Sequence, residues 1–174
     1  MIQWFQAIEN KFSCTSICFD IVDLYPSISE KLIEEAVEWA KKRIKIGSDE
    51  LDAIYNSRKS LLFSKNKAWV KRNSSSLLDV TMGSYDWAEI CELVGLYALA
   101  KLPERFQDKS IGLYRDDGLG VLESKSGAAA ERTKKELTDH FKTLGLRITI
   151  ETNLKITNFL DLTLNLNNGK YYPY

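Results

Sequence analysis

The sequence has little cysteine and histidine, and that shortage excludes several classes of protein. It holds three cysteines (Cys14, Cys18 and Cys91) and one histidine, His140. An odd number of cysteines at these spacings matches neither a disulfide framework nor a zinc site. Disulfides mark oxidising compartments, so we expect an intracellular protein, in the nucleus or the cytoplasm, that is not secreted.

Long apolar runs, repeats and linkers are also missing. No stretch approaches the roughly 18 apolar residues of a membrane span, and the N-terminus has no signal-peptide pattern. No Gly-, Ser- or Pro-rich segment marks a domain boundary. With 44% hydrophobic and 28% charged residues in 174, the chain can bury a core. We therefore expect one folded domain over residues 1–174 and no contact with a membrane.

The net charge is zero, but its distribution is uneven. Residues 41–72 contain ten basic and three acidic side chains, so this segment carries +7 and the remainder carries −7. Such a segment is either a solvated helix face or a surface that follows a phosphate backbone. Trp69, inside it, either stacks on a base or belongs to a strand buried in the core.

The first half of the chain predicts a strand followed by helices. The apolar stretch 14–24 is typical of a buried strand, which Tyr25-Pro26 should end. A capping box of Ser27 and Glu30 predicts a helix with one apolar face running to Ile44. The remaining predicted elements are a helix from Ser48 to about Leu62, a strand pair at 67–72 and 76–81, and a helix at 85–101.

The second half predicts a hairpin, a helix and further strands. Strands at 111–114 and 119–122 flank Arg115-Asp116-Asp117-Gly118, which is typical of a tight turn assisted by glycine. An amphipathic helix at 128–144 should stop at Gly145. Strands at 146–151 and 156–166 follow, with a turn at 167–169. The order favours an α+β fold: an antiparallel β-sheet with helices packed on one face.

Four aspartates lie at strand ends or turns: Asp20, Asp23, Asp116 and Asp117. Carboxylates beside apolar strands are costly unless they are paired, hydrogen-bonded or bound to a cation. If the first strand lies beside the hairpin, Asp20 faces Asp116 and Asp117, and together they suit Mg²⁺. The alternative is that Asp20 caps a strand end and the aspartates of the hairpin form an ordinary turn.

Five ordered motifs give these aspartates a context. Residues 19–28 (FDIVDLYPSI) and 114–117 (YRDD) resemble the first palm motif and the Tyr-x-Asp-Asp box of reverse transcriptases. Residues 81–84 (TMGS) resemble their middle motif, with the Met-Gly-Ser of Penelope-like retroelements. Residues 144–151 and 158–162 are similar to the later palm motifs, the second being the primer grip. The resemblance covers about residues 15–166.

The resemblance implies a polymerase palm that adds deoxynucleotides to a primer by two-metal nucleotidyl transfer. Asp20, Asp116 and Asp117 would be catalytic and would bind two Mg²⁺ or Mn²⁺ ions, with the Ile21 carbonyl as a further ligand. The implied nucleotide-binding residues are Asp23, Leu24, Tyr25, Met82, Gly83 and Ser84. The implied primer and template contacts are Tyr114, Phe159, Leu160, Asp161, Lys71 and Arg72.

The implied partners are an RNA or DNA template, a DNA primer and deoxynucleoside triphosphates. The sequence departs from the family in two respects. Trp87 stands where related motifs have a small residue, and the segments expected for fingers and thumb are largely absent. We therefore expect a partial, weakly active fragment whose fingers, thumb or nuclease modules belong to a longer parent polyprotein.

Three other interpretations remain open. The motif at 20–28 also resembles the first motif of B-family DNA polymerases, although their Lys-x-x-x-Asn-Ser-x-Tyr-Gly helix is missing and Tyr-Arg-Asp-Asp departs from their Tyr-x-Asp-Thr-Asp. A nucleotide cyclase is disfavoured because no Gly-Gly-Asp-Glu/Phe turn is present. A non-catalytic palm that still binds nucleic acid would explain Trp87 and the missing fingers.

Overall fold

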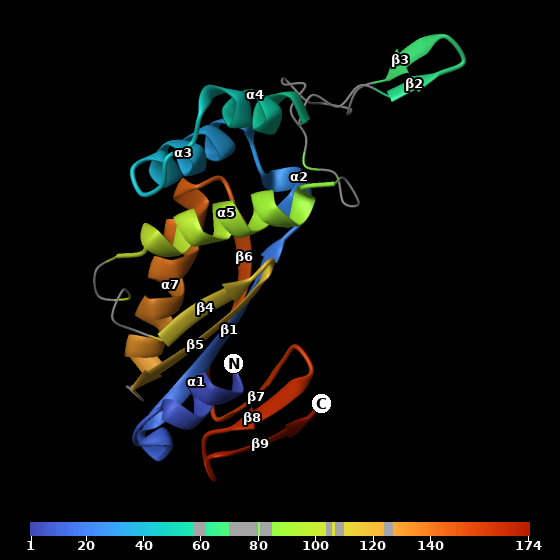
Figure 1. The fold of residues 1–174 in the computed structure, drawn as a ribbon. Coiled ribbons are helices and arrows are strands. Elements are labelled where there is room, and N and C mark those ends of the chain that lie inside the picture. Colours follow the sequence, from blue (N-terminus) through green and yellow to red (C-terminus); the bar gives the residue numbers. More distant parts are fainter. Residues whose placement is uncertain (58–61, 70–79, 81–84, 104–105, 107–109, 124–126) are drawn as a thin grey trace. The chain divides into compact units, whose positions relative to one another are not determined.

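A computed structural model describes residues 1–57, 62–69, 80, 85–103, 106, 110–123 and 127–174 (Figure 1). They divide into two compact units, Met1–Val22 with Ala98–Tyr174, and Asp23–Tyr97. The single domain over residues 1–174 stays a prediction. In the described ranges, none of the helices has the length and apolar character needed to cross a membrane.

The first unit is built on a four-stranded antiparallel sheet. Its strands are β1 (Cys14–Val22), β4 (Ser110–Tyr114), β5 (Asp117–Glu123) and β6 (Arg147–Leu154), in the order β4-β5-β1-β6. β1 is central because its residues are buried or half-buried over their whole length, as its apolar composition predicts. The α+β fold with an antiparallel sheet is thus confirmed, and the strands at 111–114, 119–122 and 146–151 are found within a few residues of their predicted bounds.

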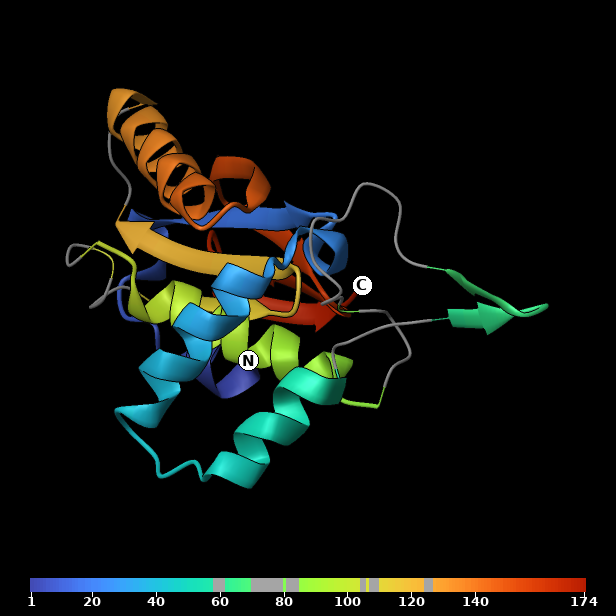
Figure 2. The ribbon, with the colours of Figure 1, turned by 90° about the horizontal axis from the view of Figure 1, so that it is seen from above.

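Helix α7 (Gly127–Thr143) covers one face of this sheet (Figure 2). Its Leu137 and Phe141 side chains are fully buried, and the Phe141 ring lies 5.3 Å from the ring of Phe19 on β1. The helix ends as predicted, because Gly145 adopts φ +75°, a left-handed conformation that costs glycine little. Burying two such side chains contributes about 3–6 kcal/mol of transfer free energy.

The opposite face carries a second core that sequence patterns did not reveal. Helix α1 (Ile2–Ala7) and the 3-10 turn η1 (Lys11–Ser13) precede β1, and a small sheet is formed by β7 (Ile156–Phe159), β8 (Leu162–Asn165) and β9 (Lys170–Pro173). The buried residues of this core are Phe5, Cys14, Leu119, Val121, Leu164 and Leu166. One predicted strand at 156–166 was wrong: Leu160 has φ 51°, so the chain turns there and forms a hairpin.

The second unit contains α2 (Leu24–Ser27), α3 (Glu30–Lys41), α4 (Ser48–Ser57) and most of α5 (Trp87–Ala100). Several predicted boundaries were wrong. The strand ends at Val22 because Asp23 turns left-handed (φ 51°), and Pro26 lies inside a helical turn instead of ending a strand. The cap of α3 is Ser29, whose Oγ accepts the Leu32 amide at 3.2 Å, and Ile44 lies beyond the helix, 61% exposed.

A short hairpin follows α4 in the chain. β2 (Leu62–Ser64) pairs with β3 (Lys67–Trp69), so the strand predicted at 67–72 is found at 67–69, paired with a segment for which no strand was predicted. Lys65 and Asn66, both with positive φ, make the turn, a two-residue loop that closes at little entropic cost. Of the partner predicted at 76–81, all but Val80 lies outside the described residues. α4 ends at Ser57, and 58–61 are likewise outside.

Candidate active site

A row of side chains crosses the four-stranded sheet near the end of β1. Asp20 on β1 lies opposite Asp117 on β5 and opposite Thr149 on β6, and Asp117 in turn lies opposite Tyr114 on β4. Residues directly opposite in antiparallel strands share one face, with Cα atoms about 4.5–5.5 Å apart. Two carboxylates far apart in the sequence therefore become neighbours, flanked by a hydroxyl and a phenol.

The turn between β4 and β5 differs from the predicted one. It consists of Arg115 and Asp116 alone, and the positive φ of 56° falls on Arg115. Asp117 therefore belongs to the strand and Gly118 is no turn residue. The Asp116 carbonyl accepts the Ile21 amide at 2.8 Å, which ties the turn to the end of β1 and fixes the register that pairs Asp20 with Asp117.

Gly118 has a packing role. It lies opposite Phe19, and a Cβ atom added to it would lie 2.1–2.4 Å from three carbons of the Phe19 ring. Because that ring is buried against Phe141 under α7, glycine is the residue that lets the hairpin lie close to β1. Phe19 and Gly118 thus pack beneath the strand positions that carry Asp20 and Asp117 on the other face.

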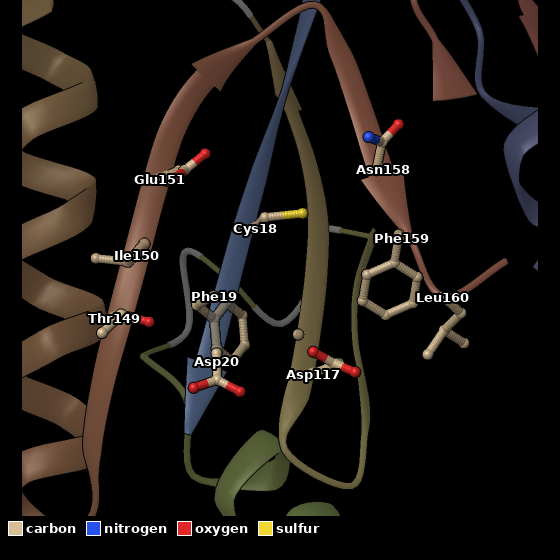
Figure 3. Close-up of a pocket in the computed structure, with 11 residues that line it drawn as sticks. Cys18, Phe19, Asp20, Asp117, Thr149, Ile150, Glu151, Asn158, Phe159 and Leu160 are labelled. Atoms are coloured by element: carbon tan, nitrogen blue, oxygen red, sulfur yellow. The ribbon is translucent and has the colours of Figure 1, made fainter. Parts of the chain in front are cut away.

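A cavity of about 460 Å³ opens on the aspartate face, between the sheet and β7. Figure 3 shows Asp20 and Asp117 at its lower end in that view, with Cys18 above them. The lining residues are Cys18, Phe19, Asp20, Asp117, Gly118, Thr149, Ile150, Glu151, Asn158, Phe159 and Leu160. Sequence reasoning missed Cys18, Thr149, Glu151 and Asn158 as site residues. The alternation of strand side chains was a usable signal for the first three, since they follow Asp20 and its partners at a period of two.

The electrostatics of this face disfavour further negative charge. Burial, then the carboxylates of Asp116 and Asp20, raise the pKa of Asp117. Burial, then Glu151 and Asp117, raise the pKa of the Cys18 thiol to about 11. A thiol with such a pKa stays protonated at neutral pH, so Cys18 is unsuited to nucleophilic catalysis. The face is instead prepared for a cation, which would relieve the repulsion among the carboxylates.

This electrostatic strain gives a stability prediction. Because the pKa of Asp117 is raised in the folded state, its ionised form destabilises the fold at neutral pH, and this destabilisation disappears as the pH falls through that pKa. We expect Asp117→Asn, measured in EDTA, to melt at a higher temperature than the wild type at pH 7. The gain should shrink as the pH is lowered and aspartate becomes protonated. A melting temperature lower than that of the wild type at pH 7 would contradict this.

The aspartate face offers only part of a coordination shell for a divalent cation. Among the described residues, no three His, Cys, Asp or Glu side chains gather as a self-sufficient metal centre. Asp20 and Asp117 face the cavity, whereas Asp116 is not part of its lining. Two facing carboxylates still fit Mg²⁺, which is usually held by one or two carboxylates and completes its coordination with water and substrate phosphates.

Two of the predicted primer residues lie on the far wall of the cavity. Phe159 and Leu160 line it from the end of β7 and the following turn, and Leu160 is 39% exposed. Asp161 is exposed, outside the cavity, and its carbonyl accepts the Tyr174 amide at 2.9 Å. Tyr114 is 49% exposed, with the Arg115 guanidinium 5.3 Å from its ring centre. The fold thus gathers three of these four residues on one side of the sheet.

The predicted nucleotide residues belong to the second unit or lie outside the described chain. Asp23 precedes α2, and the Leu24 side chain is buried, 3% exposed. Tyr25 packs edge-to-face against Trp87, with ring centres 5.3 Å apart. The predicted site residues outside the described ranges are Met82, Gly83, Ser84, Lys71 and Arg72.

Comparison with known proteins finds similarity at the level of fold. No family model matches the sequence, and no curated protein matches it. Among solved structures, apo telomerase from Candida tropicalis matches with a TM-score of 0.71 and 12% identity over 99% of this chain and 35% of that chain. The same telomerase truncated from its C-terminal domain matches with a TM-score of 0.66 and 14% identity, over 99% of this chain and 39% of that one.

A third solved structure is telomerase from Candida tropicalis in complex with a fragment of telomeric RNA. It gives a TM-score of 0.63 and 14% identity, over 99% of this chain and 32% of that one. At these identities the likeness shows the fold alone. The chain has a reverse-transcriptase-like fold, and it spans between 32% and 39% of the lengths of these three chains.

Proposed function

We propose that this chain is the palm of an RNA-directed DNA polymerase, which adds deoxynucleotides to a primer by nucleotidyl transfer. The observation that carries the proposal is the strand register that sets Asp20 directly opposite Asp117. The two residues are 97 positions apart and come from the two motifs that resemble a polymerase palm. The reverse-transcriptase-like fold supports the same conclusion.

In this proposal each part of the aspartate face has a task. Asp20 and Asp117 hold divalent ions, with Asp116 and the Ile21 carbonyl as the further ligands that the resemblance implies. When bound, such ions supply charge neutralisation and activation of an attacking hydroxyl. Phe159 and Leu160 orient the primer end from the opposite wall of the cavity. Tyr114 lies opposite Asp117 in the same row and supports the primer end from the edge of the sheet.

The nucleotide and the template are assigned to the second unit and the residues next to it. Asp23, Leu24 and Tyr25 would lie under the incoming nucleotide, where the ring of Tyr25 would reject a ribose 2′-hydroxyl by steric clash. Met82, Gly83 and Ser84 would complete that surface, and Lys71 and Arg72 would contact the template. The template in this proposal is RNA, and a nucleic acid as partner is supported by a neighbouring telomerase that was solved in complex with a fragment of telomeric RNA. Within the reverse transcriptases, the Met-Gly-Ser motif favours a Penelope-like relative.

A second candidate is a palm that no longer catalyses the reaction but still binds nucleic acid. It is favoured by the lack of a three-ligand metal cluster among the described residues. It is also favoured by the contact of Trp87 with Tyr25, which places an indole against the residue assigned to the nucleotide sugar. The two candidates differ in whether the chain turns over nucleotides.

Primer extension separates the two candidates. We expect the chain to extend a labelled DNA primer on an RNA template with deoxynucleotides and Mn²⁺, and to incorporate ribonucleotides much less. A matched assay on a DNA template reports template preference, and EDTA should abolish extension on both. Nucleic-acid binding without any extension, at high protein concentration and in both metals, would favour the non-catalytic palm.

A further inference from the structure

The hairpin of β2 and β3 has one face that is chemically distinct. Leu62 lies opposite Trp69 and Ser64 opposite Lys67, while the alternate pair is Phe63 and Ala68. Opposite residues share a face, so Trp69 and Lys67 point to the same side, two residues apart on one strand. At about 3.3 Å per residue, their backbone positions are separated by roughly 7 Å.

This face is not part of a core. Every residue from Ser64 to Trp69 is exposed, and Trp69 is 57% exposed. Tryptophan is highly buried on average, and a hairpin whose strands have three residues each gains little stability from its own pairing. The interpretation of Trp69 as a buried core residue is therefore wrong. The other interpretation, an exposed ring that stacks on a base, remains.

The charge around this ring has a single sign. Between Ala53 and Leu78 the sequence has no acidic residue and six basic ones, in a protein of zero net charge. Two of the six, Lys65 at the turn and Lys67 on β3, are exposed on the hairpin itself. The four others are Arg58, Lys59, Lys71 and Arg72. The partner that complements this segment is a polyanion.

We propose that the β2–β3 hairpin binds single-stranded nucleic acid, with one base stacked on Trp69 and the neighbouring phosphates held by Lys67 and Lys65. An aromatic ring flanked by cations is the combination that binds single strands without reading their sequence, since every base has a flat face. A duplex keeps its bases stacked on each other and offers none to Trp69. The choice of a nucleic acid as partner rests on the proposed function, but the contact itself needs no metal ion.

The proposal is tested by binding a fluorescently labelled 15-mer of deoxythymidine to the full chain in EDTA, followed by anisotropy. We expect Trp69→Ala to weaken binding about 5- to 150-fold, the range of base stacking on an aromatic ring. Trp69→Phe should keep most of the affinity. The double substitution Lys65→Ala/Lys67→Ala should lower the slope of log K against log salt by about 1.4, because each phosphate contact on a single strand contributes about 0.7.

Matched controls come from the first unit. Phe12→Ala removes an aromatic side chain that is 73% exposed, and the exposed Lys142 and Lys170 supply a double lysine control; none of these should change the affinity or the salt slope. Equal binding by wild type and Trp69→Ala overturns the proposal. So does equal affinity of the wild type for a 15-base-pair duplex, for poly-glutamate, or for vesicles of anionic lipid. The binding assay contains EDTA and needs no divalent ion. Its result is therefore independent of whether the chain extends a primer.

Discussion

Asp20→Asn is expected to weaken Mn²⁺ binding about 100-fold or more and to lower primer extension by about 10²–10³-fold. Asparagine keeps the shape of the side chain and its place in the row opposite Asp117 and Thr149, but it removes a negative oxygen ligand. In other enzymes, losing one preorganised electrostatic contact to the reacting centre lowers the catalytic rate about 10²–10³-fold. Calorimetric titration of the chain with Mn²⁺ measures the first effect without requiring turnover.

The control for Asp20→Asn is Asp139→Asn. Asp139 is an exposed carboxylate on α7, the helix that covers the other face of the sheet, so its loss changes the net charge equally without touching the site. Asp117→Asn should weaken Mn²⁺ binding as Asp20→Asn does, and in EDTA at pH 7 it should be more stable than the wild type. Equal Mn²⁺ affinity for wild type, Asp20→Asn and Asp117→Asn would remove the proposed metal site, whatever the assay of extension gives.

Gly118→Ala is expected to destabilise the first unit by about 3 kcal/mol, the upper end of the cost of overfilling a packed core. The added methyl group would overlap the Phe19 ring, which is buried and packed against Phe141. Urea unfolding followed by circular dichroism measures this as a lower midpoint at an unchanged slope. Because the clash lies beneath Asp20 and Asp117, Mn²⁺ affinity should fall as well.

Gly112→Ala is the matched control for Gly118→Ala. Gly112 lies on the edge strand of the same hairpin, and nothing lies within 4 Å of an added Cβ atom, so alanine there should be nearly neutral. A double-mutant cycle with Phe19→Ala isolates the clash, since Gly118→Ala should cost far less once the ring is gone. If Gly118→Ala lowered the free energy of unfolding equally with and without the Phe19 ring, the glycine would be required for its backbone conformation and not for this packing.

The elements that the sequence predicted well are those specified by local chemistry. A stretch rich in apolar residues predicted β1, a glycine able to adopt positive φ ended α7, and a turn sequence between two short apolar stretches predicted the hairpin around Arg115 and Asp116. The boundaries that failed are those where neighbouring residues compete for one role. Ser29 caps α3 in place of Ser27, because either serine chemically suits the position and packing selects between them.

The candidate site was predicted in part. The sequence predicted Asp20 and Asp117 as site residues, because a carboxylate beside an apolar strand is costly unless it is paired or binds a cation. It did not name Glu151 or Asn158, which reach the cavity from β6 and β7. The alternation of side chains along β6 places Glu151 on the aspartate face only once β6 is paired with β1. Asn158 was missed because the hairpin of β7 and β8 was hidden inside one predicted strand. Exposed Trp69 is a further case, since the same sequence pattern fits a core strand.

The sequence by itself determined which residues could bear charge, which runs had to be buried and where the backbone could turn, because these depend on single side chains and their near neighbours. Only the tertiary structure decided which of these residues meet. A strand has no intrinsic partner, and its register follows from the summed packing of a whole face. That packing, with Phe19 seated on Gly118 and the Asp116 carbonyl bonded to the Ile21 amide, brings the two aspartates together.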